Sequence, residues 1–179
     1  LNAAIHEKEI ARVLITHGNR EIQVEIEPDE NETDNATIDV SVAEVIIHTL
    51  SEDQIKFESP LYQKIIDASA SYFEDNEVFP DVSFFVNNPD PEFSKAIAEM
   101  IANPYELSEN WAAQHKIYTP TEVENLRNVV FDPLMRLKLF HVRLRIKELE
   151  ADFKKADSEE EITLLLHKKV RLNTMKTEV

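Results

Sequence analysis

The sequence predicts an all-α fold: a helical bundle, then a long helix and a C-terminal antiparallel helical hairpin. Three observations predict this fold. The 179 residues include only one glycine, apolar residues recur at helical spacing, and the last third carries a heptad pattern. One glycine is far below the share of roughly 7% usual in proteins, and it excludes glycine-rich phosphate loops and dinucleotide fingerprints. The lack of cysteine excludes disulfides, thiolate nucleophiles, iron–sulfur clusters and cysteine-ligated zinc.

Helix starts are marked where a capping side chain precedes a proline, because proline loses nothing at the first helical position. Such pairs occur at Ser59-Pro60, Asp90-Pro91, Thr119-Pro120 and Asp132-Pro133. The pattern Ser/Thr-x-x-Glu also predicts capping boxes, which are expected at Ser41–Glu44, Thr119–Glu122 and Ser158–Glu161.

Apolar stripes at helical spacing follow these starts. In chain order they are Ile10, Val13, Leu14 and His17; Val42, Val45, Ile46 and Leu50; Leu61, Ile65, Ala68 and Tyr72; Phe93, Ile97, Met100 and Ile101; and Val123, Leu126 and Val130. Gly18-Asn19 is expected to end the first helix as a left-handed stop. A short helix is expected around Ser108–His115, with Trp111 as a core anchor.

Residues 22–40 break the helical pattern. Ile22, Val24 and Ile26 alternate with polar residues, as do Ile38 and Val40. The alternation fits two short antiparallel strands closed by the acidic insertion Glu27–Ala36. It fits an unstructured loop equally well, because two short strands alone are marginally stable.

The last third predicts a helical hairpin. A heptad seam runs over a helix expected from Pro133 to Ala156, and its members are Met135, Leu139, Val142, Ile146, Leu149, Phe153 and Ala156. A second apolar row, Leu134, Leu137, Phe140 and Leu144, accompanies the first half only, so we expect the start of this helix to be buried on two sides. Asp157-Ser158 then breaks the chain before a final helix, and such a short connection predicts an antiparallel pair.

Charge divides the chain at the same place. The net charge is −16, with −19 in residues 1–135 and +3 in residues 136–179. This difference predicts two units, residues 1–131 (bundle) and 132–179 (long helix and hairpin). A chain this acidic repels nucleic acids and anionic membranes.

Candidate sites for chemistry are weak. The segment Asp29–Asn35 lacks the glycine and the closing glutamate of a calcium loop, and the six histidines show no ligand spacing. No serine lies in a nucleophile elbow. We therefore expect no enzyme activity, metal or cofactor in this chain, and no membrane span or leader peptide is readable. The chain begins at Leu1, so we expect a fragment or a processed product, from an intracellular protein.

The final helix carries apolar residues on more than one face, which is more than a two-helix pair can bury. The residues predicted to contact a partner protein are Leu165, Lys168, Lys169, Arg171, Leu172 and Met175. In this interpretation the apolar side chains supply most of the binding energy, and the charges tune the encounter rate.

Four stretches in order resemble the C-terminal domain of bacterial DNA primase (DnaG type). They are residues 7–19 (EKEIARVLITHGN), residues 42–66 (VAEVIIHTLSEDQIKFESPLYQKII), residues 84–111 (FFVNNPDPEFSKAIAEMIANPYELSENW), and residues 137–156 with 159–179. The resemblance implies a cytoplasmic, monomeric, noncatalytic domain whose hairpin docks on the N-terminal domain of the replicative helicase (DnaB type). It assigns no individual contact residue. The alternative is a nucleic-acid-contacting module that uses the basic C-terminal hairpin.

Overall fold

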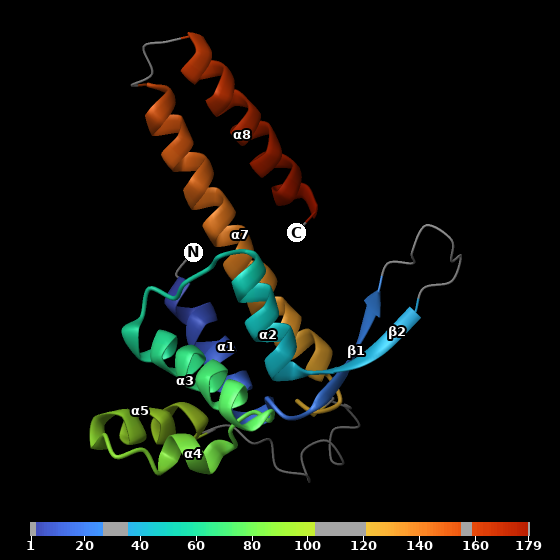
Figure 1. The fold of residues 1–179 in the computed structure, drawn as a ribbon, viewed down its shortest axis with the longest axis vertical. Coiled ribbons are helices and arrows are strands. Elements are labelled where there is room, and N and C mark those ends of the chain that lie inside the picture. The colour runs from blue at the N-terminus through green and yellow to red at the C-terminus, as the bar shows by residue number, and fades with distance from the viewer. Residues whose placement is uncertain (1–2, 27–35, 103–120, 155–158, 179) are drawn as a thin grey trace, which may run out of the picture.

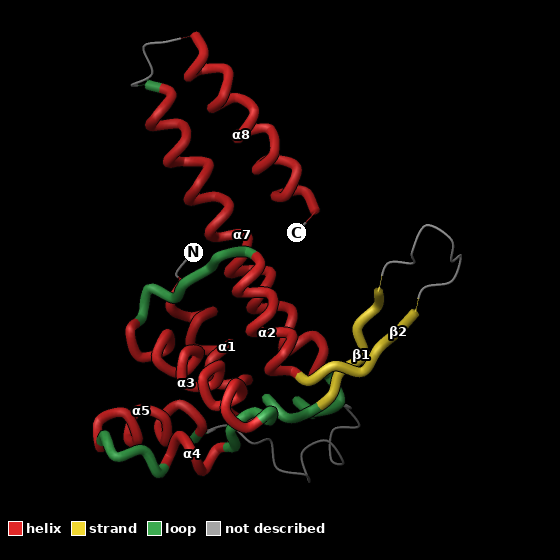
Figure 2. Tube along the Cα trace, in the orientation of Figure 1, coloured by secondary structure: helices red, strands yellow, loops and turns green. Residues whose placement is uncertain are grey.

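The computed structural model describes residues 3–26, 36–102, 121–154 and 159–178. These residues form seven α-helices and one two-stranded sheet, so the prediction of a mainly helical chain is confirmed (Figure 1, Figure 2). No helix in the described ranges is long and apolar enough to cross a membrane. The elements are α1 (Ala3–His17), β1 (Glu21–Ile26), β2 (Ala36–Ser41), α2 (Val42–Glu52), α3 (Pro60–Asn76), α4 (Val82–Val86), α5 (Pro91–Ile101), α7 (Leu126–Phe153) and α8 (Glu159–Glu178).

Helix α1 organises the bundle, because it packs against α2, α3, α4, α5 and the first half of α7. The apolar stripes predicted for these helices supply much of the core. Among the most buried side chains are Ile10, Val13, Ile46, Ile65, Ile97, Leu134 and Leu137. Burial of these side chains, more than local helix propensity, holds helices of this length together in water.

Two of the predicted helix starts are confirmed, and one works differently. Ser41 and Glu44 form a reciprocal capping box at α2, and Asp90 accepts hydrogen bonds from the first backbone N–H groups of α5. Ser59 precedes Pro60 at α3 as expected, but its side chain makes no capping hydrogen bond. The fully buried carboxylate of Glu7 accepts instead from the backbone N–H groups of Glu58 and Ser59, at 2.7 and 3.1 Å. This long-range contact anchors the two residues just before α3, whereas a local cap would accept from N–H groups inside the first turn of the helix.

Helix α1 ends at His17 as predicted, but Gly18 is not left-handed. The glycine is needed for close approach, because a Cβ there would lie 2.5 Å from the carbonyl oxygen of Leu14. The carbonyl of Gly18 also accepts a 3.0 Å hydrogen bond from Ala43, which ties the end of α1 to the start of α2.

The alternation in residues 22–40 forms strands. β1 and β2 pair antiparallel, with Ile22 opposite Val40 and Val24 opposite Ile38. Figure 1 shows this pair projecting from the bundle beside α2. The acidic segment Asp29–Asn35 lies outside the described residues, as do Trp111, the predicted helix at Ser108–His115 and the predicted cap at Ser158.

The predicted helix start at Pro133 is wrong. α7 begins at Leu126 and runs through Pro133 without interruption. Proline removes one helical hydrogen bond here. However, Val130, Pro133, Leu134 and Leu137 are all buried against the bundle, and this burial outweighs the loss. The predicted boundary between residues 131 and 132 therefore falls inside a continuous helix, and the division into two units stays a prediction.

Candidate functional site

The hairpin of α7 and α8 projects from the bundle (Figure 1), and one apolar seam holds it together. On α7, Val142 is buried, while Ile146 and Phe153 are half-buried. On α8, Leu165 is only 8% exposed. Val142 and Leu165 are separate from the continuous core of the bundle, so the hairpin has its own small core. Leu165, one of the residues predicted to contact a partner protein, thus lies in the seam, and its contact with a partner stays a prediction.

Lys169 joins the two helices across one side of the hairpin. Its Nζ donates a 2.9 Å hydrogen bond to Oε1 of Glu150 and lies 5.9 Å from the centre of the Phe153 ring. The hydrogen bond and the positive charge of Lys169 hold the pKa of Glu150 below its usual value. The side chain of Lys169 therefore links α7 to α8 within the hairpin.

The Lys169–Glu150 pair also places two stripes of exposed side chains next to each other. On α7, Arg143, Lys147, Glu150 and Lys154 are spaced four, three and four residues apart, and therefore share one face. On α8, Ile162, Leu166 and Lys169 are spaced four and three residues apart and also share one face, with Val170 next to them. We call this surface the basic–apolar flank; its members are Arg143, Lys147 and Lys154 of α7 and Ile162, Leu166 and Val170 of α8, all exposed.

The opposite side of the hairpin faces the loop after α2. A groove of about 590 Å³ lies between the hairpin and this loop. Three predicted contact residues, Lys168, Arg171 and Leu172, line it from α8. The rest of the lining comes from Arg145, Glu148, Leu149 and Asp152 of α7 and from Glu52, Asp53 and Gln54. The Nζ of Lys138 lies 3.0 Å from Oδ2 of Asp53, which holds the loop against α7.

The two sides of the hairpin differ in charge balance. In the groove, the bases Lys168 and Arg171 lie near acidic side chains of the same chain. On the basic–apolar flank, Glu150 is the acid of the α7 stripe and already pairs with Lys169. The flank therefore suits a partner that presents apolar and acidic side chains.

The structure places the six predicted contact residues in different surroundings. Lys168, Arg171 and Leu172 lie together in the groove, and Lys169 forms an ion pair with Glu150. Leu165 is buried, and the side chain of Met175 lies outside the described ones.

Sequence reasoning missed the flank. The spacing of Arg143, Lys147, Glu150 and Lys154 was a usable signal, because it runs parallel to the apolar seam of the same helix. The apolar half of the flank had no such signal, since Leu164, Leu165 and Leu166 are consecutive and only packing decides which of them is buried.

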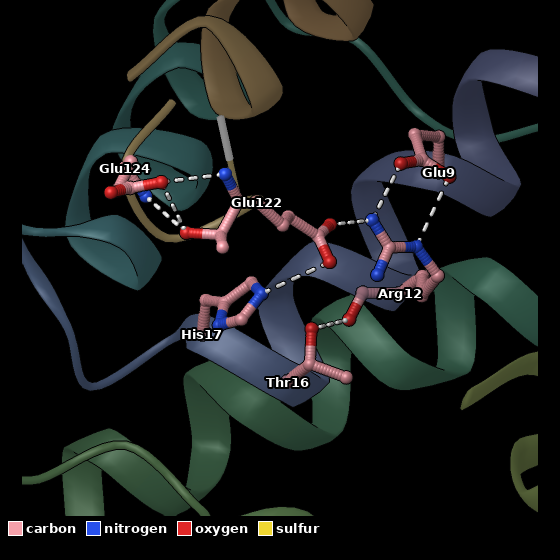
Figure 3. Close-up of polar contacts among 7 residues, drawn as sticks. Glu9, Arg12, Thr16, His17, Glu122 and Glu124 are labelled. Atoms are coloured by element: carbon pink, nitrogen blue, oxygen red, sulfur yellow. Dashed lines mark hydrogen bonds and ion pairs between the residues drawn. The ribbon is translucent and has the colours of Figure 1, made fainter. Parts of the chain in front are cut away.

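A second polar cluster lies in the bundle, where α1 meets residues 121–125 (Figure 3). Arg12 donates to Glu9 at 2.7 and 3.2 Å and also to Glu122. Oε2 of Glu122 lies 3.6 Å from Nε2 of His17. The hydrogen bond from Arg12 holds the pKa of Glu122 below its usual value, although burial opposes this shift. Burial also opposes the charge on Arg12, but hydrogen bonds to the two carboxylates raise the pKa of Arg12 above its ordinary value.

The cluster gives Glu122, which was expected to form a capping box with Thr119, a partner on α1. Thr119 lies outside the described residues. In the turn before α7, Glu124 accepts from the backbone N–H and the hydroxyl of Thr121, at 2.7 and 2.9 Å. The partner of Glu122 in this cluster, Arg12, lies 110 residues earlier in the chain. The cluster pairs its charges internally, so its role in this structure is to hold residues 121–125 against α1.

Metal-binding geometry does not occur within the described ranges. No group of three or more His, Asp or Glu side chains there is arranged to hold a metal ion. His17 and His141 are half-buried. Burial, with a smaller effect of the Arg145 charge, lowers the pKa of His141, against an opposing effect of Glu58 and Glu7.

Comparison with known proteins gives one match. A family model described as "Domain of unknown function (DUF8430)" matches residues 2–179. No curated protein and no solved structure matches the chain.

Proposed function

We propose that this chain, which belongs to the DUF8430 family, is a noncatalytic protein-interaction domain that recruits DNA primase to the replicative helicase. The observation that carries the proposal is the basic–apolar flank on a hairpin that projects from the bundle. Exposed apolar side chains of this kind, rimmed by charge, are typical of protein-binding surfaces. The resemblance of four sequence segments to the DnaG-type C-terminal domain supports the helicase (DnaB type) as the partner.

The exposed side chains of the flank determine which side chains a partner surface must present. Leu166 and Val170 are 50% and 64% exposed, so their burial releases water without disturbing the hairpin seam. Arg143, Lys147 and Lys154 lie beside them and favour an acidic rim on the partner. In this proposal the apolar residues supply affinity, and the bases steer the encounter.

The decisive test is calorimetric titration of the chain with the purified N-terminal domain of the helicase. Leu166→Ala is expected to weaken binding about 10-fold, because central apolar anchors contribute most of the energy of an interface. Leu164→Ala is the matched control: Leu164 lies on the same helix and is 57% exposed, but it is outside the flank. Thermal melting of both variants should match the unmodified chain.

Equal affinities of the Leu166→Ala and Leu164→Ala variants would show that the flank is not the contact. The basic stripe of α7 also fits the alternative function, contact with nucleic acid. That alternative predicts no binding to the helicase domain, together with DNA binding that weakens steeply with added salt. Helicase binding with little DNA binding at physiological salt supports the proposal.

A further inference from the structure

The β1–β2 pair is amphipathic, and its apolar face is only partly covered. Cross-strand partners share a face, so Ile22, Val24, Ile38 and Val40 lie on one side of the pair. Glu21, Gln23, Thr37 and Asp39 lie on the other. Ile22 is buried next to the bundle, whereas Ile38, further out, is 45% exposed. An isolated strand pair with an exposed apolar face is poorly stabilised unless something covers that face.

The apolar face borders a groove of about 700 Å³ between the sheet and the bundle. Val24, Ile38 and Val40 line it from the sheet, and Val45 and Phe73 line it from α2 and α3. The rings of Phe73 and Phe79 are stacked with their centres 4.4 Å apart, which makes one wall rigid and aromatic. No residue of α8 lines the groove, so it is separate from the hairpin surfaces.

Acidic groups stand at the edge of this apolar groove. Glu44 of α2 and Glu74 of α3 are exposed and belong to its lining. His48, also in the lining, has its Nδ1 3.4 Å from Oε2 of Glu52. The wider surroundings have the same sign, since residues 1–135 carry a net charge of −19. An acidic ligand would be repelled here, and a basic one attracted.

We propose that this groove binds an amphipathic basic helix of a partner protein, with apolar side chains inserted between the sheet and α2 and α3 and with Lys or Arg facing Glu44 and Glu74. The volume suits several apolar side chains of such a helix. An amphipathic helix laid in an apolar groove is a common mode of peptide recognition. Charge complementarity selects a basic helix from the amphipathic helices that would fit sterically.

The test uses synthetic helices as probes, in fluorescence anisotropy with the whole chain. The first probe carries leucines at spacings of three and four residues and lysine at the remaining positions. The second has glutamate in place of lysine, and the third has serine in place of leucine. The chain is expected to bind the first probe at least 10-fold more tightly than either other probe.

The groove is tested by one matched pair of variants. Ile38→Gln places an amide on the apolar face of the sheet, and Thr37→Gln places the same group on the polar face one residue away. Neither change alters the net charge. Ile38→Gln is expected to weaken binding of the leucine–lysine probe about 10-fold, and Thr37→Gln to leave it unchanged. Glu74→Gln should weaken it less, about 2-fold to 5-fold, and the effect should shrink at high salt.

Three outcomes overturn the proposal. Equal binding by the Ile38→Gln and Thr37→Gln variants would mean that the probe attaches elsewhere on the acidic surface. Equal binding of the lysine and glutamate probes would remove the charge argument. Self-association of the chain in light scattering, abolished by Ile38→Gln, would make a second copy of the chain the occupant.

Discussion

The two halves of α7 belong to one helix but lie in different surroundings. In the bundle half, Leu134 and Leu137 are fully buried in the core, and α7 packs against α1, α2 and β1. In the hairpin half, Val142 is buried, Leu144 is exposed, and the contact is with α8. The comparison shows that helix continuity does not imply equal stability, because local stability follows the apolar area buried around each turn. The hairpin keeps apolar residues exposed that the bundle would bury.

The largest expected effect comes from shortening one leucine or isoleucine in each half. Leu137→Ala is expected to lower the free energy of unfolding by about 3 kcal/mol, because it leaves a cavity in a closed core. Ile146→Ala, in the half-buried seam, is expected to lower it by about 1 kcal/mol. Urea denaturation followed by circular dichroism measures both. Equal losses would break the comparison and show that the seam is as well packed as the bundle.

An intermediate effect is expected from Glu122, which links α1 to the residues before α7. At pH 7, Glu122→Gln is expected to cost about 1 kcal/mol, since the ion pair with Arg12 is partly exposed and screened. The pKa of Glu122 is lower in the folded chain than its usual value of 4.5. Its contribution is therefore present above pH 4.5 and is lost as the pH falls through the lower, folded-state pKa.

Thermal melting of the unmodified chain and of Glu122→Gln from pH 7 to pH 3 checks this prediction. The two melting curves should converge as the solution is acidified. Parallel curves over the whole range would show that the carboxylate charge contributes nothing to the junction.

The smallest effect is expected from Glu150, the corresponding acid of the hairpin. Its carboxylate is exposed to solvent, so the ion pair with Lys169 is strongly screened. Glu150→Gln should therefore leave the melting temperature within experimental error at neutral pH. A clear drop would show that this pair, and with it the hairpin, is more tightly built than its exposure indicates.

Local signals in the sequence were sufficient wherever both partners of an interaction lie within a few residues. The capping box of Ser41 and Glu44 and the cap at Asp90 are of this kind. Glu7 and Glu122 were missed because their partners lie 51 and 110 residues away. Pro133 was misread for the same reason, since burial against other helices outweighs its local preference to start a helix.

The candidate site was predicted at the level of the hairpin but not of its residues. Apolar residues on several faces of the last helix indicated a surplus, yet the surplus residues could not be separated from the seam before the position of α7 was known. Leu165 and Leu166 are neighbours in the chain; the first is buried and the second is half-exposed. A truncation after Phe131, which the predicted boundary invites, would remove Leu134 and Leu137 from the bundle core.

The length of α7 makes it a spacer. Phe131 lines the apolar groove between the β1–β2 pair and the bundle, and Lys147 lies on the basic–apolar flank. Sixteen residues of one helix separate the two side chains, which corresponds to about 24 Å along the axis at about 1.5 Å per residue. If two proteins bound at these two surfaces, the continuous helix α7 would fix the distance between them. A change in helix length by one turn would shift that distance by about 5.4 Å and rotate the flank only slightly.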